Sequence, residues 1–147
     1  MAQEAKQVVA DCGCELVERP IRTVVVDDTD MVLDSICALL QCDRRIEIVG
    51  RAANGVEALD AVASLGPDLV IMDINMPVMG GIQCAALLGQ YFPMLKVVLM
   101  SGIDSPKIRE QCRSTGADAF AYKMNFREEF RLAMRAIFRE KECNYTA

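Results

Sequence analysis

The sequence contains no histidine and no tryptophan, and only 5% of its residues are aromatic. Without histidine, a Ser-His-Asp triad, a histidine general base and a histidine metal ligand are all excluded. The sequence also lacks any run of about 20 apolar residues that would cross a membrane. Residues 1–20 have no long apolar segment of the kind found in secretory signals. We therefore expect a cytoplasmic protein without membrane contact.

The seven cysteines are odd in number and irregularly spaced, which disfavours a secreted disulfide scaffold and favours scattered reduced thiols. Cys12 and Cys14 are the only close pair, but their spacing is not that of a zinc or redox motif. Positive charge is also scarce, because 16 basic residues face 21 acidic ones for a net charge of −5. This balance argues against a surface that mainly neutralises phosphate backbones, so we expect no nucleic-acid binding by this chain alone.

Apolar residues, in contrast, make up 52% of the 147 residues, enough for one domain with a sizeable core. Short apolar runs alternate with helical patterns along the chain, which predicts an α/β fold. We expect a five-stranded parallel sheet of the flavodoxin-like, doubly wound (βα)5 type, with strand order 2-1-3-4-5. The expected strands are 22–26, 46–50, 69–72, 96–100 and 119–122, and the expected helices begin near residues 29, 55, 80, 106 and 126.

The expected domain covers residues 21–140, with a partly ordered extension over 1–20 and a tail over 141–147. In the first expected helix, Thr29 or Asp30 suits the N-cap position. The inward face of that helix is predicted from the spacing of its apolar residues, namely Met31, Ile36, Leu39 and Leu40.

Polar residues follow four of the expected strands. Asp27 and Asp28 follow the first strand, Asp73 the third, Ser101 the fourth and Lys123 the fifth. The carboxyl ends of parallel strands share one edge of the sheet, and strands one and three are neighbours in the expected order. The three carboxylates should therefore meet in one pocket, where they repel unless a cation lies among them. All-oxygen ligation suits a hard divalent ion, Mg²⁺ first and Mn²⁺ as its substitute.

A carboxylate in such a pocket can attack phosphorus and form an aspartyl phosphate, so we predict that Asp73 accepts a phosphoryl group. We expect Asp28 and Asp73 to hold the metal, Asp27 to act through water, and the backbone carbonyl of Asn75 to complete the metal sphere.

The charge of the phosphoryl oxygens must also be neutralised for transfer to proceed. Lys123 is expected to pair with one phosphoryl oxygen as a point charge, and the Ser101 hydroxyl to donate to another. Singly, an aspartate after a strand is most often a turn or cap residue, and a lysine there is most often solvated. The complete set favours a site, because each strand end that should contribute carries the appropriate residue type.

This set resembles the receiver domain of two-component response regulators, which has the CheY-like fold, and the resemblance covers roughly residues 20–140. That family has an acidic pair after strand one, the phosphoacceptor Asp after strand three, Thr or Ser after strand four and Lys after strand five. The segments 73–77 (Asp-Ile-Asn-Met-Pro) and 116–123 (Gly-Ala-Asp-Ala-Phe-Ala-Tyr-Lys) also resemble the family closely. Segment 46–55 is similar to the NarL/FixJ-type subgroup.

The resemblance implies a phosphorelay receiver that takes phosphate from the phospho-His of a sensor histidine kinase, or from a phosphotransfer protein. It implies no enzymatic activity beyond the chain's own phosphorylation and slow dephosphorylation. It also implies a switch in which Ser101 moves toward the phosphoryl group and Phe120 swings inward. This change remodels the face formed by the helix from 106, the strand 119–122 and the helix from 126. Partners bind that face, which also suits a homodimer.

Three positions depart from the family pattern. Met124 stands where many receivers have a proline with a cis bond, and a cis bond without proline is disfavoured. Phe120 lacks the hydroxyl of the common tyrosine, and Gly80 replaces an aspartate often found in that loop. These differences affect the details of the switch rather than the phosphoacceptor chemistry.

Three alternative hypotheses stay open. In the first, the chain is the N-terminal part of a DNA-binding transcriptional regulator, since receivers of this subgroup usually precede a helix-turn-helix domain. In the second, the chain is a receiver-like scaffold that works without phosphorylation. In the third, it is a metal-dependent phosphatase with an aspartate nucleophile, although such enzymes typically have a second carboxylate two residues after the nucleophile, where this chain has Asn75.

Overall fold

The computed structural model describes residues 19–138, so most of the expected N-terminal extension and all of the expected tail lie outside the described residues. Strands and helices alternate along the whole of this range, as the apolar pattern predicted. The elements are β1 (Ile21–Val26), α2 (Asp30–Leu40), β2 (Ile46–Ala52), α3 (Gly55–Leu65), β3 (Leu69–Asp73), α4 (Gly81–Tyr91), β4 (Lys96–Ser101), α5 (Pro106–Ser114), β5 (Ala119–Tyr122), the 3-10 turn η1 (Lys123–Asn125) and α6 (Phe126–Ile137).

All five strands form one parallel sheet in the order β2-β1-β3-β4-β5, which confirms the predicted topology. β3 lies at the centre and is buried along its whole length, because helices cover both of its faces. Val26 of β1 pairs with Met72 of β3, and Asp73 pairs with Met100 of β4. This register brings the carboxyl ends of the three strands to one edge of the sheet.

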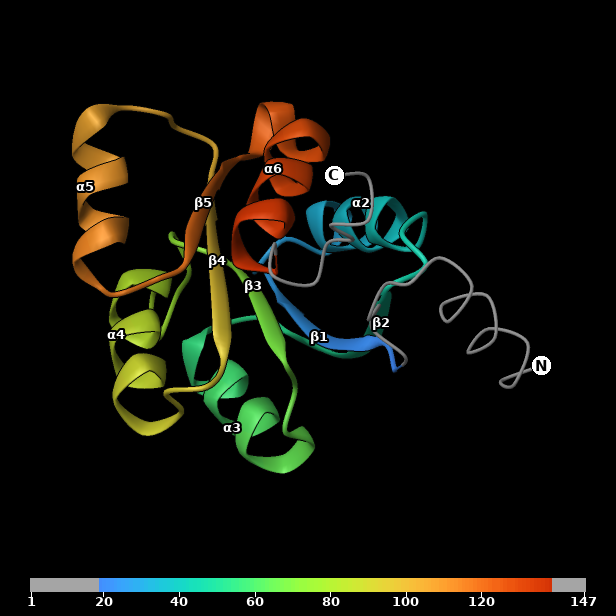
Figure 1. Cartoon of the computed structure of the whole chain (residues 1–147). Coiled ribbons are helices and arrows are strands. Elements are labelled where there is room, and N and C mark those ends of the chain that lie inside the picture. The colour runs from blue at the N-terminus through green and yellow to red at the C-terminus, as the bar shows by residue number, and fades with distance from the viewer. Residues whose placement is uncertain (1–18, 139–147) are drawn as a thin grey trace, which may run out of the picture.

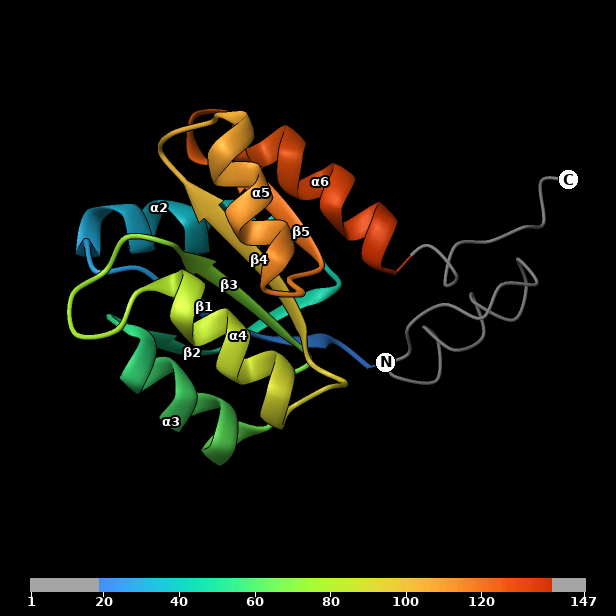
Figure 2. The same cartoon turned by 90° about the vertical axis from the view of Figure 1, so that its left-hand side faces the viewer.

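Helices cover the sheet on both faces, so the core has two halves (Figures 1 and 2). α2 and α6 pack on one face, where Leu40 and Met134 are fully buried against Ile71 of β3. α3, α4 and α5 pack on the other face, where Leu88 lies against Val70. Side chains of β3 thus contribute to both halves in alternation, as the twofold repeat of a strand requires.

The predicted inward face of α2 is wrong at two positions. Met31 is 77% exposed and Leu39 is 37% exposed, whereas Leu33 and Cys37 are buried. The residues that pack on the sheet recur every three or four positions, and they are Leu33, Ile36, Cys37 and Leu40. Apolar residues alone do not identify a face when they occur all around a helix.

Thr29 occupies the N-cap position of α2, as expected, but its side chain makes no capping hydrogen bond. Instead, the backbone N–H of Thr29 donates to Oδ1 of Asp27 at 3.0 Å. The start of the helix is therefore tied to the carboxylate that ends β1.

Gly81 at the start of α4 allows the helix to lie directly against the end of β3. A Cβ atom at this position would lie 2.2 Å from the backbone oxygen of Asp73 and 2.8 Å from Cα of Ile74. Backbone atoms cannot yield as a flexible side chain does, so only glycine fits. The preceding loop contains Val78 in the left-handed region at φ 68°, a strained conformation for a β-branched residue.

The four cysteines in the described range are free thiols, in line with the expectation of scattered reduced cysteines. Cys37, Cys84 and Cys112 are buried, and burial raises the pKa of Cys84 to about 11. The Cys12–Cys14 pair lies outside the described residues. No helix of residues 19–138 is long and apolar enough to cross a membrane.

Candidate functional site

Three carboxylates meet at the carboxyl edge of the sheet. Asp27 and Asp28 follow β1, Asp73 ends β3, and one oxygen from each lies within 4.8 Å of the others. Asp27 is 1% exposed and Asp73 is 4% exposed, while Asp28 faces solvent. The structure therefore brings together the acidic residues that the strand-end pattern selected, with two of them deeply buried.

Lys123 reaches this acidic cluster from the end of β5. Its Nζ atom lies 2.7 Å from Oδ2 of Asp27 and 3.1 Å from Oδ1 of Asp73. The sequence predicted Lys123 at this edge but did not predict that it joins the two buried carboxylates. A cation between them offsets part of the cost of burying two negative charges.

The pKa of Asp73 reflects this conflict between burial and charge. Burial raises the pKa of Asp73 and outweighs the attraction of Lys123, and the nearby carboxylates Asp27 and Asp28 raise it further. Burial alone would lower the pKa of Lys123, but hydrogen bonding and attraction to Asp27 and Asp73 raise it overall. Lys123 therefore stays protonated, and ionisation of Asp73 is less favourable than that of an exposed aspartate.

One buried oxygen of the cluster has a single described partner. Oδ2 of Asp27 lies 2.7 Å from Nζ of Lys123, and no other described donor approaches it. A buried carboxylate oxygen of this kind, beside two further carboxylates, fits a bound cation. The donor set contains only oxygen atoms, which is what Mg²⁺ and Mn²⁺ prefer.

Ser101 and Asn75 lie at the same edge of the sheet, Ser101 at the end of β4 and Asn75 in the loop after β3. Ser101 is the last residue of β4 and is fully buried, and its Oγ atom accepts a hydrogen bond from the N–H of Ile103 at 3.0 Å. The hydroxyl hydrogen of Ser101 remains available for an acceptor. Asn75 lies exposed in the loop directly after β3, two residues beyond Asp73.

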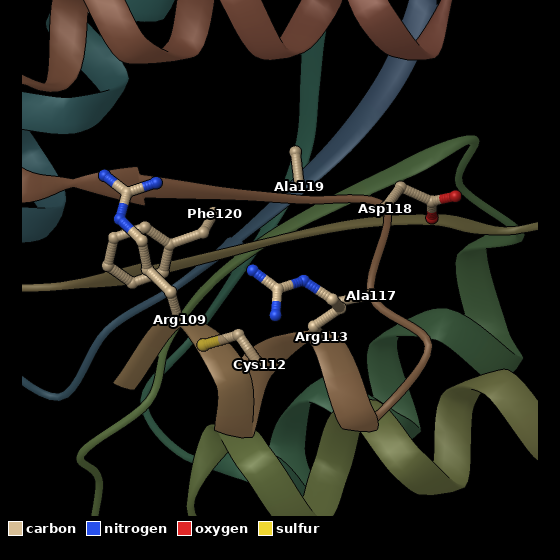
Figure 3. A pocket seen from close by; sticks show the side chains of 7 residues that line it. All are labelled: Arg109, Cys112, Arg113, Ala117, Asp118, Ala119 and Phe120. Atoms are coloured by element: carbon tan, nitrogen blue, oxygen red, sulfur yellow. The ribbon is translucent and has the colours of Figure 1, made fainter. Parts of the chain in front are cut away.

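Phe120 of β5 lies further from the acidic cluster, between β5 and α5. Its ring is half-buried and lies under the guanidinium group of Arg109, whose Cζ is 4.7 Å from the ring centroid. Figure 3 shows the two side chains lying together. They border a cavity of about 200 Å³. The cavity is lined by Arg109, Cys112, Arg113, Ala117, Asp118, Ala119 and Phe120.

Sequence reasoning missed two residues that support this region. Arg109 donates hydrogen bonds to Asp104 and stacks on Phe120. Glu129 of α6 accepts a hydrogen bond from the N–H of Tyr122 at 2.9 Å. The spacing of Arg109 and Asp104 is five residues, which no helix or strand period indicates. No local signal identifies Glu129, because its partner belongs to another element.

The entry from β5 into α6 is the 3-10 turn η1, in which Met124 is 78% exposed. No cis peptide bond occurs anywhere in residues 19–138, which agrees with the trans bond expected where many receivers have proline. Lys123 is therefore the first residue of a turn in which all peptide bonds are trans.

Comparison with known proteins places these features in one family. Residues 23–135 match the family model described as "Response regulator receiver domain". The chain is 32% identical to "Response regulator GacA" of Pseudomonas viridiflava over 118 residues, which cover 80% of this chain and 55% of that protein. It is 30% identical to "Transcriptional regulatory protein LnrK" of Bacillus subtilis over 103 residues, 70% of this chain and 47% of that protein.

A relative with a different name is also similar over the same domain. The chain is 36% identical over 99 residues to "Protein-glutamate methylesterase/protein-glutamine glutaminase 4" of Geobacter metallireducens, which cover 67% of this chain and 28% of that protein. The chain thus spans about half the length, or less, of these curated relatives.

Solved structures agree in fold. The signal receiver domain of the response regulator NarL from Mycobacterium tuberculosis is 30% identical and superposes with a TM-score of 0.73, covering 84% of this chain and 97% of that one. With the family match extending across the sheet and the acidic cluster, the chain belongs to the response regulator receiver domain family, whose members serve two-component signalling.

Proposed function

We propose that this chain is a phosphorelay receiver in which Asp73 accepts a phosphoryl group from the phospho-His of a sensor histidine kinase or a phosphotransfer protein. The observation that carries the proposal is the position of Asp73. Its carboxylate is 4% exposed, touches Lys123 at 3.1 Å and lies within 4.8 Å of two further carboxylates. A structural role alone does not account for two buried carboxylates joined by one lysine, with a third carboxylate beside them, at the edge of a parallel sheet.

In the proposed reaction a carboxylate oxygen of Asp73 attacks phosphorus as the phosphorus–nitrogen bond of the donor breaks. The electron pair of that bond stays with the imidazole nitrogen, which takes up a proton. Later, water attacks the phosphorus of the aspartyl phosphate, which releases inorganic phosphate and restores the carboxylate. The raised pKa of Asp73 is consistent with a reactive group kept partly out of water.

Asp27, Asp28 and Asp73 are the residues that would hold Mg²⁺ or Mn²⁺, with the backbone carbonyl of Asn75 as a further donor. When bound, such an ion neutralises charge on the phosphoryl oxygens. The buried Oδ2 of Asp27, whose one described partner is Lys123, supports a direct or water-mediated place for Asp27 in this set.

Lys123 and Ser101 complete the proposed pocket. Lys123 already lies 3.1 Å from the nucleophilic carboxylate, so its Nζ is placed to pair with an oxygen of the group that Asp73 receives. Ser101 is buried at the end of the adjacent strand β4, and its unused hydroxyl hydrogen suits a phosphoryl oxygen.

The proposed output is a change of the face made by α5, β5 and α6. Ser101 and Phe120 lie on adjacent strands, and Phe120 is half-buried beneath a polar side chain rather than locked in the core. We propose that phosphorylation shifts Ser101 and Phe120 together and so alters this face for a protein partner or for a second copy of the chain. The reduced buried thiols suit the cytoplasm as its location.

The phosphoacceptor role is tested with the whole chain, Mg²⁺ and acetyl phosphate, followed by intact mass measurement. We expect a gain of about 80 Da, one HPO₃ unit. The gain should be absent in Asp73→Asn and retained in Asp60→Asn, which replaces an exposed aspartate of α3. A parent chain that gains no mass in Mg²⁺ with any small phosphodonor, or an Asp73→Asn chain that still gains it, would contradict the proposal.

A second candidate concerns the whole protein rather than this domain. The relatives that the chain matches include a transcriptional regulatory protein, of whose length the match covers 47%. The chain is therefore also a candidate for the receiver part of a DNA-binding regulator. The net charge of −5 argues against DNA binding by this chain, so the chain alone should not retard DNA in an electrophoretic shift assay.

We propose no enzymatic output for this chain beyond its own phosphorylation and dephosphorylation. A phosphatase with an aspartate nucleophile would use a general acid two residues after Asp73, and Asn75 at that position cannot donate a proton as a carboxylic acid does. Turnover of a generic phosphate ester by the chain would favour the phosphatase. Mg²⁺ binding without phosphorylation by any donor would favour a receiver-like scaffold.

A further inference from the structure

The outer face of the Phe120 ring is covered by a charged group. The guanidinium of Arg109 from α5 stacks over the ring at 4.7 Å, and the two side chains lie together in Figure 3. A cation above an aromatic face is attracted by the negative potential of the ring. The position of Phe120 therefore depends on where Arg109 is held.

Arg109 is held by acidic groups from two other segments. Its Nε and one terminal nitrogen donate to the two carboxylate oxygens of Asp104, at 2.6 Å and 3.0 Å. The same terminal nitrogen lies 3.5 Å from Oε1 of Glu129 in α6. Glu129 in turn accepts a hydrogen bond from the N–H of Tyr122 at the end of β5. One arginine thus connects the loop after β4, the helix α5, the ring on β5 and the helix α6.

The loop that holds Arg109 begins at Ser101. Oγ of Ser101 accepts from the N–H of Ile103 at 3.0 Å, and Asp104 is the next residue. A displacement of the Ser101 hydroxyl therefore moves the backbone that carries Asp104, and with it the bidentate partner of Arg109. These contacts form a path from Ser101, at the end of β4, to the Phe120 ring.

We propose that Arg109 is a positioning residue that holds the Phe120 ring in its half-buried place beside α5 and releases it when the loop carrying Asp104 moves. This inference rests on the proposed function, because the movement would begin when Ser101 engages the phosphoryl group. Phe120 has no hydroxyl with which to fix an outer position by its own hydrogen bond. The arginine supplies a restraint from outside the ring instead.

Arg113 provides the matched control. It lies one helical turn further along α5 and lines the same cavity, but the acidic partner recorded for it is Glu110 of its own helix. Its side chain is 69% exposed, compared with 39% for Arg109. Replacing Arg113 removes the same charge from the same surface without removing the contact to Phe120.

The first test observes the ring without any ligand. The chain contains only five phenylalanines, so ring ¹³C labelling with a Phe120→Leu variant assigns the Phe120 signal by NMR. Arg109→Ala should shift and broaden this signal, because the ring then exchanges between positions. Arg109→Lys should give an intermediate effect, since lysine keeps a charge for Asp104 but lacks the planar fork. Arg113→Ala should leave the signal unchanged.

The second test titrates the whole chain with beryllofluoride, a phosphoryl mimic, in Mg²⁺. Arg109→Ala should bind it about three- to tenfold more tightly than the parent chain, because the restraint that opposes the inner ring position is gone. Asp104→Asn should change affinity in the same direction, and Arg113→Ala should match the parent chain.

The outcomes separate the two proposals. An unchanged Phe120 signal in Arg109→Ala, or equal effects of Arg109→Ala and Arg113→Ala in either test, would overturn the role of Arg109. A parent chain that takes up no beryllofluoride in Mg²⁺ would contradict the proposed function. The ligand-free NMR comparison then still decides whether Arg109 holds the ring.

Discussion

At the scale of single residues, the acidic cluster is a place where folding and proposed chemistry oppose each other. Asp27 and Asp73 are both buried, and Lys123 is the cation that joins them. Burial nevertheless outweighs the lysine and raises the pKa of Asp73. A group in that condition lowers the stability of the ligand-free chain, and it is retained at sites where a ligand restores the balance.

The pH dependence of stability should reveal this cost. The folded chain holds the Asp73 proton more tightly than the unfolded chain does, so ionisation disfavours folding. The cost is absent in acid below the ordinary aspartate pKa of ~4. It appears as the pH rises through that value and is complete above the raised folded pKa. Without Mg²⁺, Asp73→Asn should therefore increase the free energy of unfolding at pH 7, by on the order of 1 kcal/mol.

Urea denaturation at neutral and acidic pH measures this effect. The gain of Asp73→Asn should vanish in acid, where the parent carboxyl group is neutral as well. Asp60→Asn, which changes an exposed side chain, should stay within about 0.5 kcal/mol of the parent chain at both pH values. A gain of equal size at neutral and acidic pH would show that packing, rather than charge, explains the change.

At the scale of elements, the site depends on how closely α4 approaches β3. The first residue of α4 is Gly81, and a Cβ there would collide with the backbone of Asp73 and Ile74. The helix start therefore braces the backbone that carries the proposed nucleophile. The sequence predicted only that a helix begins near residue 80, because the backbone that Gly81 contacts is identified by the fold.

Gly81→Ala should destabilise the chain by about 1–3 kcal/mol, as overpacking against an immovable backbone does. It should also slow phosphorylation by acetyl phosphate, since relief of the clash displaces Asp73. Urea denaturation and intact mass measurement follow the two effects.

Gly89→Ala is the matched control within the same helix. The nearest atom to its added Cβ is the backbone oxygen of Thr115 at 3.7 Å, an ordinary contact. This change should stabilise the chain by up to about 1 kcal/mol through helix propensity. Equal effects at both glycines would refute a special role for the start of α4.

At the scale of the whole molecule, four strand ends act together although they are far apart in the chain. A parallel sheet in the order β2-β1-β3-β4-β5 brings the ends of β1, β3, β4 and β5 to one edge. A ligand that binds there contacts elements from both halves of the core. Binding at this edge should therefore stabilise the entire fold by mass action.

Mg²⁺ should raise the free energy of unfolding by about 2.7 kcal/mol at a free concentration 100 times its Kd. Asp28→Asn should largely remove this increase without lowering the ligand-free stability, because Asp28 is exposed and its charge disfavours the ionised form of Asp73. Thermal or urea denaturation across a Mg²⁺ series measures both. If Asp28→Asn responds to Mg²⁺ as strongly as the parent chain, the metal lies elsewhere.

The sequence by itself determined the fold class, the strand order and the residues of the acidic cluster. It did so because apolar periodicity marks each strand and helix locally, and because the ends of parallel strands necessarily share an edge. Asp27, Asp28, Asp73, Ser101 and Lys123 were all recognised by their places after strands. Each of these inferences uses only neighbouring residues and one general rule of topology.

Only the tertiary structure decided which groups touch. Lys123 forms ion pairs with both Asp27 and Asp73. Gly81 lies against the backbone of Asp73. Arg109 contacts both Asp104 and Phe120. Most of these contacts join residues far apart in the chain, and no sequence period relates them. The inward face of α2 was mispredicted for the same reason, since the sheet it packs against selects Leu33 and Cys37 over Met31 and Leu39. Local pattern specifies elements, whereas close packing between elements specifies contacts.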